Sequence, residues 1–269
     1  SGAPAVLVTN NDVTATEPIF VSAMQAGTAL ITIENTKLVA DEVETAGSGR
    51  PVTGNAVRLN NVSGPVMLDG LTIEARRFGI NATGITTSST STLTITNNTL
   101  TFPNGQEFDI DGSGTAGDAL GEQAIGIQIS GVSGATAPVI EDNVIGTPGS
   151  TAGGPFYGYS VFDVQADVPT VIRQTSALTG ASISGVQQGV FLFNTTDFST
   201  VAGSNVEING LVMDDFTGTS PNDDVNFHAG VFVFTISPGS GPSALLSTTI
   251  RDVTVRNTGI AGGTSAPPD

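Results

Sequence analysis

Short strand-like segments, each broken by a polar or glycine residue, recur along the chain. In STLTITNNTLTF (91–102), two runs that alternate apolar and polar residues flank Asn97 and Asn98. Alternation with a period of two is typical of a strand with one buried face. The same pattern recurs at residues 29–40, 64–75, 137–147, 169–180, 204–216 and 247–258. The chain is therefore predicted to consist of many short strands joined by bends at equivalent places.

A second strand-like run, usually introduced by glycine, lies between these segments. Examples are FGINATGI (78–85), QGVFLFN (188–194) and AGVFVFT (229–235). Alignment on the bends makes one apolar position equivalent in seven segments: Ile33, Leu68, Ile95, Ile140, Ile172, Ile208 and Ile250. The spacing is unequal but the order of the pieces is kept, which favours a solenoid in which each repeat makes one turn.

Amide, acidic and glycine residues mark the bends. The pairs are Asp69-Gly70, Asn97-Asn98, Asp142-Asn143 and Asn209-Gly210. Asn and Gly tolerate the left-handed backbone conformation that a sharp corner requires. Stacked amides can also hydrogen-bond to one another from one turn to the next. We therefore expect these residues to shape the corners rather than to bind a ligand.

The order xIxxNxI followed by GIxI resembles the repeat of the pectate-lyase-like superfamily, over residues 29–258. The resemblance implies an all-β fold, a right-handed parallel β-helix of about seven coils with loop insertions. Residues 1–269 would form one domain, in which residues 1–28 are an N-terminal cap or the first coil and 259–269 a flexible tail or linker. Proteins with this fold include polysaccharide lyases and hydrolases, phage tailspikes and segments of bacterial adhesins.

Charge narrows the possible partners. The chain has 8 Lys and Arg residues against 25 Asp and Glu residues, a formal net charge of −17. Nucleic-acid binding requires clustered cations, so no nucleic-acid partner is expected. No apolar run is long enough to span a bilayer, so no membrane insertion is expected. There are no cysteines, and only 12% of residues are charged, so the polar surface must consist mainly of Thr, Ser, Asn and Gly.

One insertion contains the start of a calcium-binding motif. In EFDIDGSGTAGD (107–118), alternate oxygen-bearing residues are followed by glycine, as at the beginning of a calcium loop. The acidic residue expected at the twelfth position is replaced by leucine. The sequence favours a solvated acidic turn, and a calcium ion is the candidate cofactor as the alternative. The candidate metal ligands are Asp109, Asp111, Ser113 and Asp118.

A second insertion, DDFTGTSPNDDVNFHAG (214–230), contains two acidic pairs and the only histidine. Inverting glycosidases require two separated carboxylates. Similarity to polygalacturonase-like hydrolases would imply Asn-Thr-Asp, Asp-Asp, Gly-His-Gly and Arg-Ile-Lys. Here the first motif has an extra residue, Phe-His-Ala replaces the third and the fourth is absent. If the protein is an enzyme, the candidate catalytic residues are Asp215, Asp224 and His228.

Two further possibilities concern sugar chemistry. A lyase-like site would need acidic residues for calcium and a basic residue, and Asp163, Asp167 and Arg173 could gather on one face. A sugar-binding cleft usually offers aromatic rings, but the chain has no Trp and only two Tyr residues, Tyr157 and Tyr159. The Phe residues of GVFLFN and GVFVFT are expected to be stacked in the core.

Composition, acidity and the deformed catalytic motifs favour a non-enzymatic module of a larger adhesin or surface protein, secreted or at the cell surface. Its expected partner is a polysaccharide or a glycan of a host or cell surface. The alternative is a polysaccharide-processing enzyme, either a glycoside hydrolase or a polysaccharide lyase. A segment of a trimeric phage tailspike is the third hypothesis.

Overall fold

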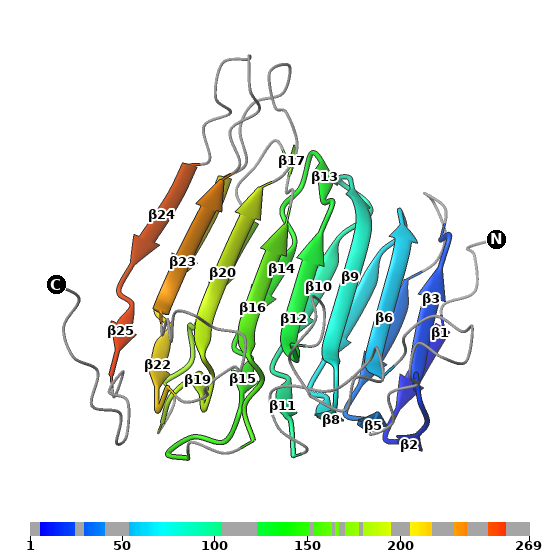
Figure 1. The fold of residues 1–269 in the computed structure, drawn as a ribbon. Coiled ribbons are helices and arrows are strands. Elements are labelled where there is room, and N and C mark those ends of the chain that lie inside the picture. Colours follow the sequence, from blue (N-terminus) through cyan, green and yellow to red (C-terminus); the bar gives the residue numbers. More distant parts are fainter. Residues whose placement is uncertain are drawn as a thin grey trace, which may run out of the picture.

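The computed structural model describes most of the strand-forming chain. The described residues are 6–24, 30–40, 54–103, 123–150, 153–162, 165–166, 170–177, 180–194, 205–216, 229–235 and 247–256. All regular secondary structure in these residues is β-strand. The strands form three long sheets that run side by side along the molecule (Figure 1).

The three sheets take their strands in turn along the chain. The first sheet contains β1 (Val6–Thr9), β4 (Ile31–Glu34), β7 (Val66–Asp69), β10 (Leu93–Thr96), β14 (Val139–Glu141), β18 (Thr170–Arg173), β21 (Asn205–Asn209) and β24 (Ser247–Arg251). The second contains β2 (Asp12–Thr14), β5 (Lys37–Ala40), β8 (Thr72–Ala75), β11 (Thr99–Thr101), β15 (Val144–Ile145), β19 (Ile183–Ser184), β22 (Val212–Asp214) and β25 (Thr254–Val255). The third contains β3 (Ile19–Ser22), β6 (Asn55–Val62), β9 (Phe78–Thr87), β12 (Ile125–Ser130), β16 (Tyr157–Phe162), β20 (Gln188–Asn194) and β23 (Ala229–Thr235), with β13 (Ser133–Gly134) and β17 (Gln165–Ala166) beside the end of β9.

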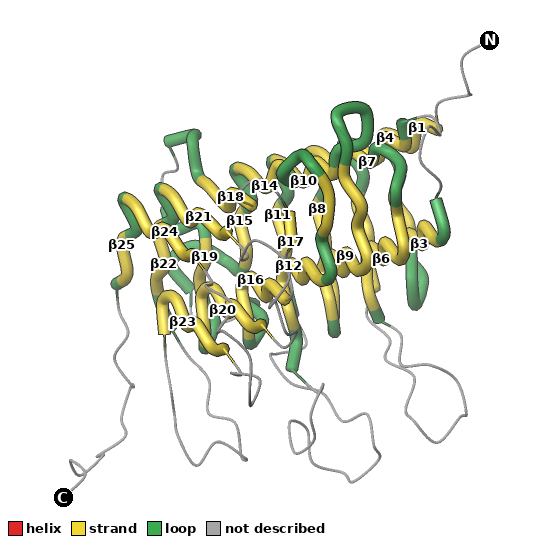
Figure 2. The backbone as a smooth tube through the Cα atoms, turned by 90° about the horizontal axis from the view of Figure 1, so that it is seen from above, coloured by secondary structure: helices red, strands yellow, loops and turns green. Residues whose placement is uncertain are grey.

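Each strand pairs in parallel with the strand one coil away, which confirms the predicted parallel β-helix. The seven positions aligned in the sequence occupy one continuous register, since Ile33 pairs with Leu68, Leu68 with Ile95, and so on to Ile250. The tube view shows the strands of the first sheet along one side of the molecule and those of the third sheet along the other (Figure 2). The first coil consists of β1, β2 and β3, within residues 6–22.

The interior is a single apolar core that runs along the coils. From Ile33 to Ile208, the aligned side chains of the first sheet are at most 1% exposed. Burying one such side chain stabilises the fold by roughly 1.5–3 kcal/mol, so the stacked positions dominate the stability. Core-facing apolar side chains are exposed in the terminal coils, for example Val6 and Ile250, because among the described residues each terminal coil is covered on one side only.

The bends between the first and second sheets have the predicted left-handed geometry. Asn97 and Asp142 each have a φ of 56°, and Gly70 has a φ of 63°. A side chain at position 70 would be strained, and its Cβ would also lie 2.9 Å from Oδ1 of Asn35 on the preceding coil. The amide and glycine residues of the sequence pattern therefore determine where the chain turns.

Candidate functional site

Most of the site residues expected from the sequence lie outside the described residues. This holds for Asp109, Asp111, Ser113, Asp118, Asp163, Asp167, Asp224 and His228. Within the described part of the chain, no group of three or more His, Cys, Asp or Glu residues is placed to hold a metal ion. The same residues contain no helix with the length and apolarity needed to cross a membrane.

Asp215 lies at a bend rather than on an open sheet face. Its φ is 54°, and its carbonyl oxygen accepts a hydrogen bond of 3.1 Å from the backbone N–H of Gly185. Its own backbone N–H donates to Oδ1 of Asp214 at 2.9 Å. The backbone of Asp215 thus stabilises the turn after β22.

Arg173 is also engaged locally. Its Nη2 lies 3.0 Å from Oε2 of Glu141, in the neighbouring strand of the first sheet and in register with it. The Arg173 side chain is 46% exposed, so this is a surface ion pair, worth about 1 kcal/mol or less. The interaction orients the guanidinium along the sheet.

The outer face of the third sheet carries a group of stacked aromatic rings. Along β20, Val190 and Leu192 point into the core and are at most 1% exposed, whereas Phe191 and Phe193 alternate with them and are partly exposed. Neighbouring strands add further partly exposed rings. We call the set the aromatic face; it consists of Tyr157, Phe162, Phe191, Phe193 and Phe232.

Two of the ring contacts, Phe191 with Phe232 and Phe162 with Phe193, join residues that are in register on neighbouring coils. Phe191 pairs with Phe232 across β20 and β23, and their ring centroids lie 5.6 Å apart with an interplanar angle of 14°. Phe191 also stacks on Tyr157 at 5.1 Å and on Phe193 at 5.9 Å. Phe162 meets Phe193 edge to face at 5.5 Å. Strand spacing along the solenoid thus sets the separation of the ring pairs that are in register.

Buried polar side chains accompany these rings. Ser160, in register with Phe191, is fully buried although it lies on the outward side of β16. Gln188, in register with Tyr157, is 8% exposed. The Oγ of Ser160 and the Oε1 of Gln188 have no hydrogen-bond partner. A buried acceptor without a partner is uncommon. Both atoms are shielded from solvent, so they lie beneath the aromatic face and not on its surface.

Towards the N-terminal end, the same outer face becomes polar. Nη1 of Arg58 lies 3.3 Å from Oε1 of Glu17, and Cζ of Arg58 lies 5.2 Å from the centroid of the Phe20 ring. Cζ of Arg77 lies over the ring of Phe78, 4.6 Å from its centroid. Burial, together with the charge of Arg58, lowers the pKa of Arg77. The third sheet therefore presents cationic and amide groups at one end and aromatic rings at the other.

The sequence interpretation missed the aromatic face. It placed the Phe residues of GVFLFN and GVFVFT in the core, which is wrong for Phe191, Phe193 and Phe232. The alternation within QGVFLFN indicates which rings face outwards, because valine and leucine occupy one side of the strand and the two phenylalanines the other. Only one of the two sides can face the core.

The stacked coils define the chain as a parallel β-helix protein. No protein-family model, curated protein or solved structure matches it. Its function must therefore be inferred from the surfaces that the fold constructs.

Proposed function

We propose that this chain is a non-enzymatic, secreted or cell-surface β-helix module that binds carbohydrate on its aromatic face. The stacking of Phe191 between Tyr157 and Phe232 is the observation that carries the proposal. Partly exposed rings that lie side by side offer apolar surface to the C–H faces of sugar rings. The rings succeed one another along the solenoid, so the favoured ligand is a polysaccharide or a surface glycan rather than a single sugar.

The polar surroundings support the same ligand class. The N-terminal part of the outer face of the third sheet adds the side chains of Arg58 and Asn81, which are in register with each other. A binding surface that combines apolar platforms with a few polar groups gives both affinity and orientation. The deformed hydrolase motifs in the sequence support binding rather than catalysis.

Three finer proposals accompany this function. The asparagine bends support membership of the pectate-lyase-like superfamily. The acidic, hydroxyl-rich composition supports a place within a larger adhesin or surface protein. The motif at Asp109, Asp111, Ser113 and Asp118 supports stabilisation by calcium.

The aromatic face can be tested by affinity electrophoresis in gels containing neutral or acidic polysaccharides. A double variant, Phe191→Ala with Phe193→Ala, is expected to weaken retardation by roughly tenfold or more, since a buried aromatic ring contributes roughly 1.5–3 kcal/mol. The control is Leu7→Ala, because Leu7 is an exposed apolar side chain on β1 of the first sheet, away from the aromatic face. Equal retardation of both variants would contradict the proposal.

The enzyme alternative is tested on the same polysaccharides. The parent protein would be an enzyme if it released reducing ends or unsaturated uronates and if this release were lost in Asp215→Asn, Asp224→Asn or His228→Ala. That result would contradict the non-enzymatic function. We expect no turnover by the parent protein, with or without calcium.

A further inference from the structure

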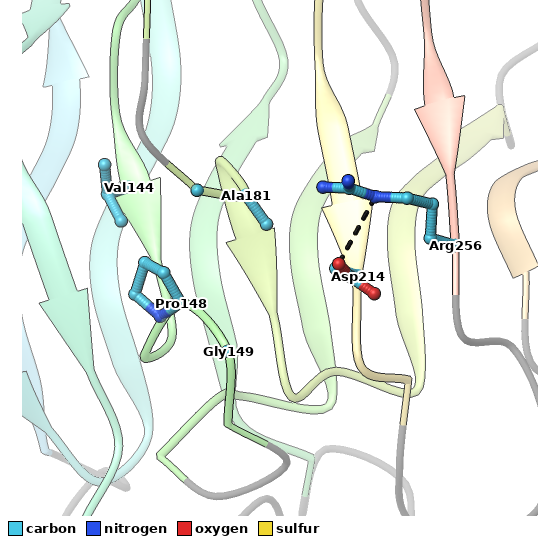
Figure 3. Close-up of a pocket in the computed structure, with 7 residues that line it drawn as sticks. Val144, Pro148, Gly149, Ala181, Asp214 and Arg256 are labelled. Carbon is cyan, nitrogen blue, oxygen red and sulfur yellow. Dashed lines mark ion pairs between the residues drawn. The ribbon is translucent and has the colours of Figure 1, made fainter.

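A separate cleft lies on the outer side of the second sheet. Its volume is about 580 Å³ (Figure 3). It is lined by Val144, Pro148, Gly149, Gly180, Ala181, Asp214 and Arg256. A cleft of this size can hold a small ligand.

The walls come from four successive coils. Val144 belongs to β15, and the turn at Pro148 and Gly149 follows that strand. Gly180 and Ala181 lead into β19 in the next coil, and the missing side chain at position 180 lets Pro148 approach, since a Cβ there would lie 3.0 Å from the proline Cβ. The opposite wall is formed by the residues at the ends of β22 and β25. The cleft thus has an apolar side and a charged side.

An ion pair forms the charged side. Nε of Arg256 lies 3.3 Å from Oδ2 of Asp214. The backbone N–H of Arg256 donates to the carbonyl oxygen of Met213 at 2.9 Å, which holds the arginine beside β22. The Asp214 side chain is 16% exposed and that of Arg256 52%. In Figure 3 the guanidinium extends over Asp214 towards Ala181.

The ion pair presents donors and an acceptor side by side. Because Nε faces Asp214, the two terminal nitrogens of Arg256 remain as donors in a fixed plane. The Asp214 carboxylate pairs with Arg256 through Oδ2 and accepts from the backbone of Asp215 through Oδ1, and each carboxylate oxygen can accept more than one hydrogen bond. Adjacent hydroxyls of a sugar ring can accept from one partner and donate to the other. The ring itself would lie against Val144, Pro148 and Ala181.

Charge decides between a neutral ligand and an acidic one. Asp214 compensates the single cation of the cleft, and the whole chain carries a formal net charge of −17. An anionic ligand would therefore enter an unfavourable field. We propose that this cleft binds one neutral pyranose ring through a vicinal pair of hydroxyls held by Asp214 and Arg256. The site lies on the second sheet, is separate from the aromatic face on the third and does not depend on it.

The test is a titration of the isotope-labelled protein with the methyl glycosides of glucose, galactose and mannose, followed by amide NMR shifts. For at least one glycoside we expect shifts at Gly149, Gly180 and Ala181. Arg256→Gln and Asp214→Asn should each weaken that binding by about tenfold or more, because each removes a hydrogen bond from a charged group. The control is Arg251→Gln, which removes a cation of the same coil outside the cleft and should leave the affinity unchanged.

Several results would overturn the proposal. These are the absence of shifts with all three glycosides, equal affinity in Arg256→Gln, and binding of glucuronate in preference to the neutral sugars. Full affinity in Arg256→Lys would overturn the paired-hydroxyl geometry, because lysine keeps the charge but loses the planar fork. The double variant of Phe191 and Phe193 should retain the cleft shifts, so failure of either sugar site is distinguishable from failure of the other.

Discussion

Nδ2 of Asn98 donates a hydrogen bond of 2.8 Å to Oδ1 of Asn143 on the next coil, and both side chains are at most 1% exposed. The remaining groups of the two amides bond to the backbone. Oδ1 of Asn98 accepts from the N–H of Leu71 at 2.9 Å, and Nδ2 of Asn143 donates to the carbonyl oxygen of Ile95 at 3.0 Å. The ladder therefore ties three coils together at their bends and satisfies backbone groups that the corner removes from the sheets.

Removal of the Asn98 amide should destabilise the fold. Asn98→Leu leaves the N–H of Leu71 without its acceptor inside the core and removes one of two donors to Oδ1 of Asn143, the other being the backbone N–H of residue 98. We expect a loss of about 2–4 kcal/mol in unfolding free energy. Urea denaturation followed by circular dichroism measures it. The control is Asn97→Gly, since the adjacent residue is exposed and its φ of 56° suits glycine. Equal losses in both variants would contradict the buried ladder.

The Asp142 carboxylate is expected to stabilise the fold at neutral pH and to lose this effect in acid. Its Oδ1 accepts from the N–H groups of Thr175 at 2.6 Å and Ser176 at 3.0 Å, and Oδ2 accepts from Oγ1 of Thr175 at 2.7 Å. Burial raises the pKa of Asp142, but the hydrogen bonds from Ser176 and Thr175 outweigh it, so the pKa of the folded state lies below the ordinary value.

A lowered folded-state pKa means that the contribution is complete above the unfolded pKa of about 4 and is lost as the pH falls through the folded value. We expect Asp142→Asn to lower the free energy of unfolding by about 1–2 kcal/mol at neutral pH. The difference from the parent should shrink as the solution is acidified. Urea midpoints across this pH range measure it, and a difference that stays constant with pH would contradict the assignment.

The glycines that begin the strands of the third sheet are required for close packing between coils. At Gly158 an added Cβ would lie 2.6 Å from the carbonyl oxygen of Gly189 and 2.9 Å from Cγ2 of Ile183. Gly158→Ala is therefore expected to cost about 1–3 kcal/mol through overpacking. Ser130→Ala, on a partly exposed position of the same sheet, should change the unfolding midpoint little. A tolerated alanine at position 158 would show that the coils can separate locally.

Calcium binding should be detectable by calorimetry if the acidic motif holds the ion. We expect heat on titration of the parent chain and its loss in Asp109→Ala combined with Asp111→Ala, because hard cations require several oxygen ligands. Asp12→Ala, which removes an exposed carboxylate from β2, serves as the control. Identical heats for parent and double variant would reject the metal site.

Much of the architecture could be predicted from the chain because a β-helix is built from local repeats. Ile33, Leu68 and Ile95 were aligned from sequence alone, and the structure pairs them in the same register. Each bend also has its own local signal, since Asn, Asp and Gly lower the cost of a left-handed residue at any such corner.

By itself, then, the sequence determined the strands, the bends and the stacking of equivalent positions, because these depend on alternation and on single-residue backbone preferences. Only the tertiary structure decided what the outer surface presents. It turned Phe191 and Phe193 outwards and stacked Phe232 beside them. It also brought Arg256 to Asp214 from a different coil. The physical reason is that unequal insertions separate surface neighbours by varying lengths of chain, and only the accumulated winding of the coils determines which side chains meet.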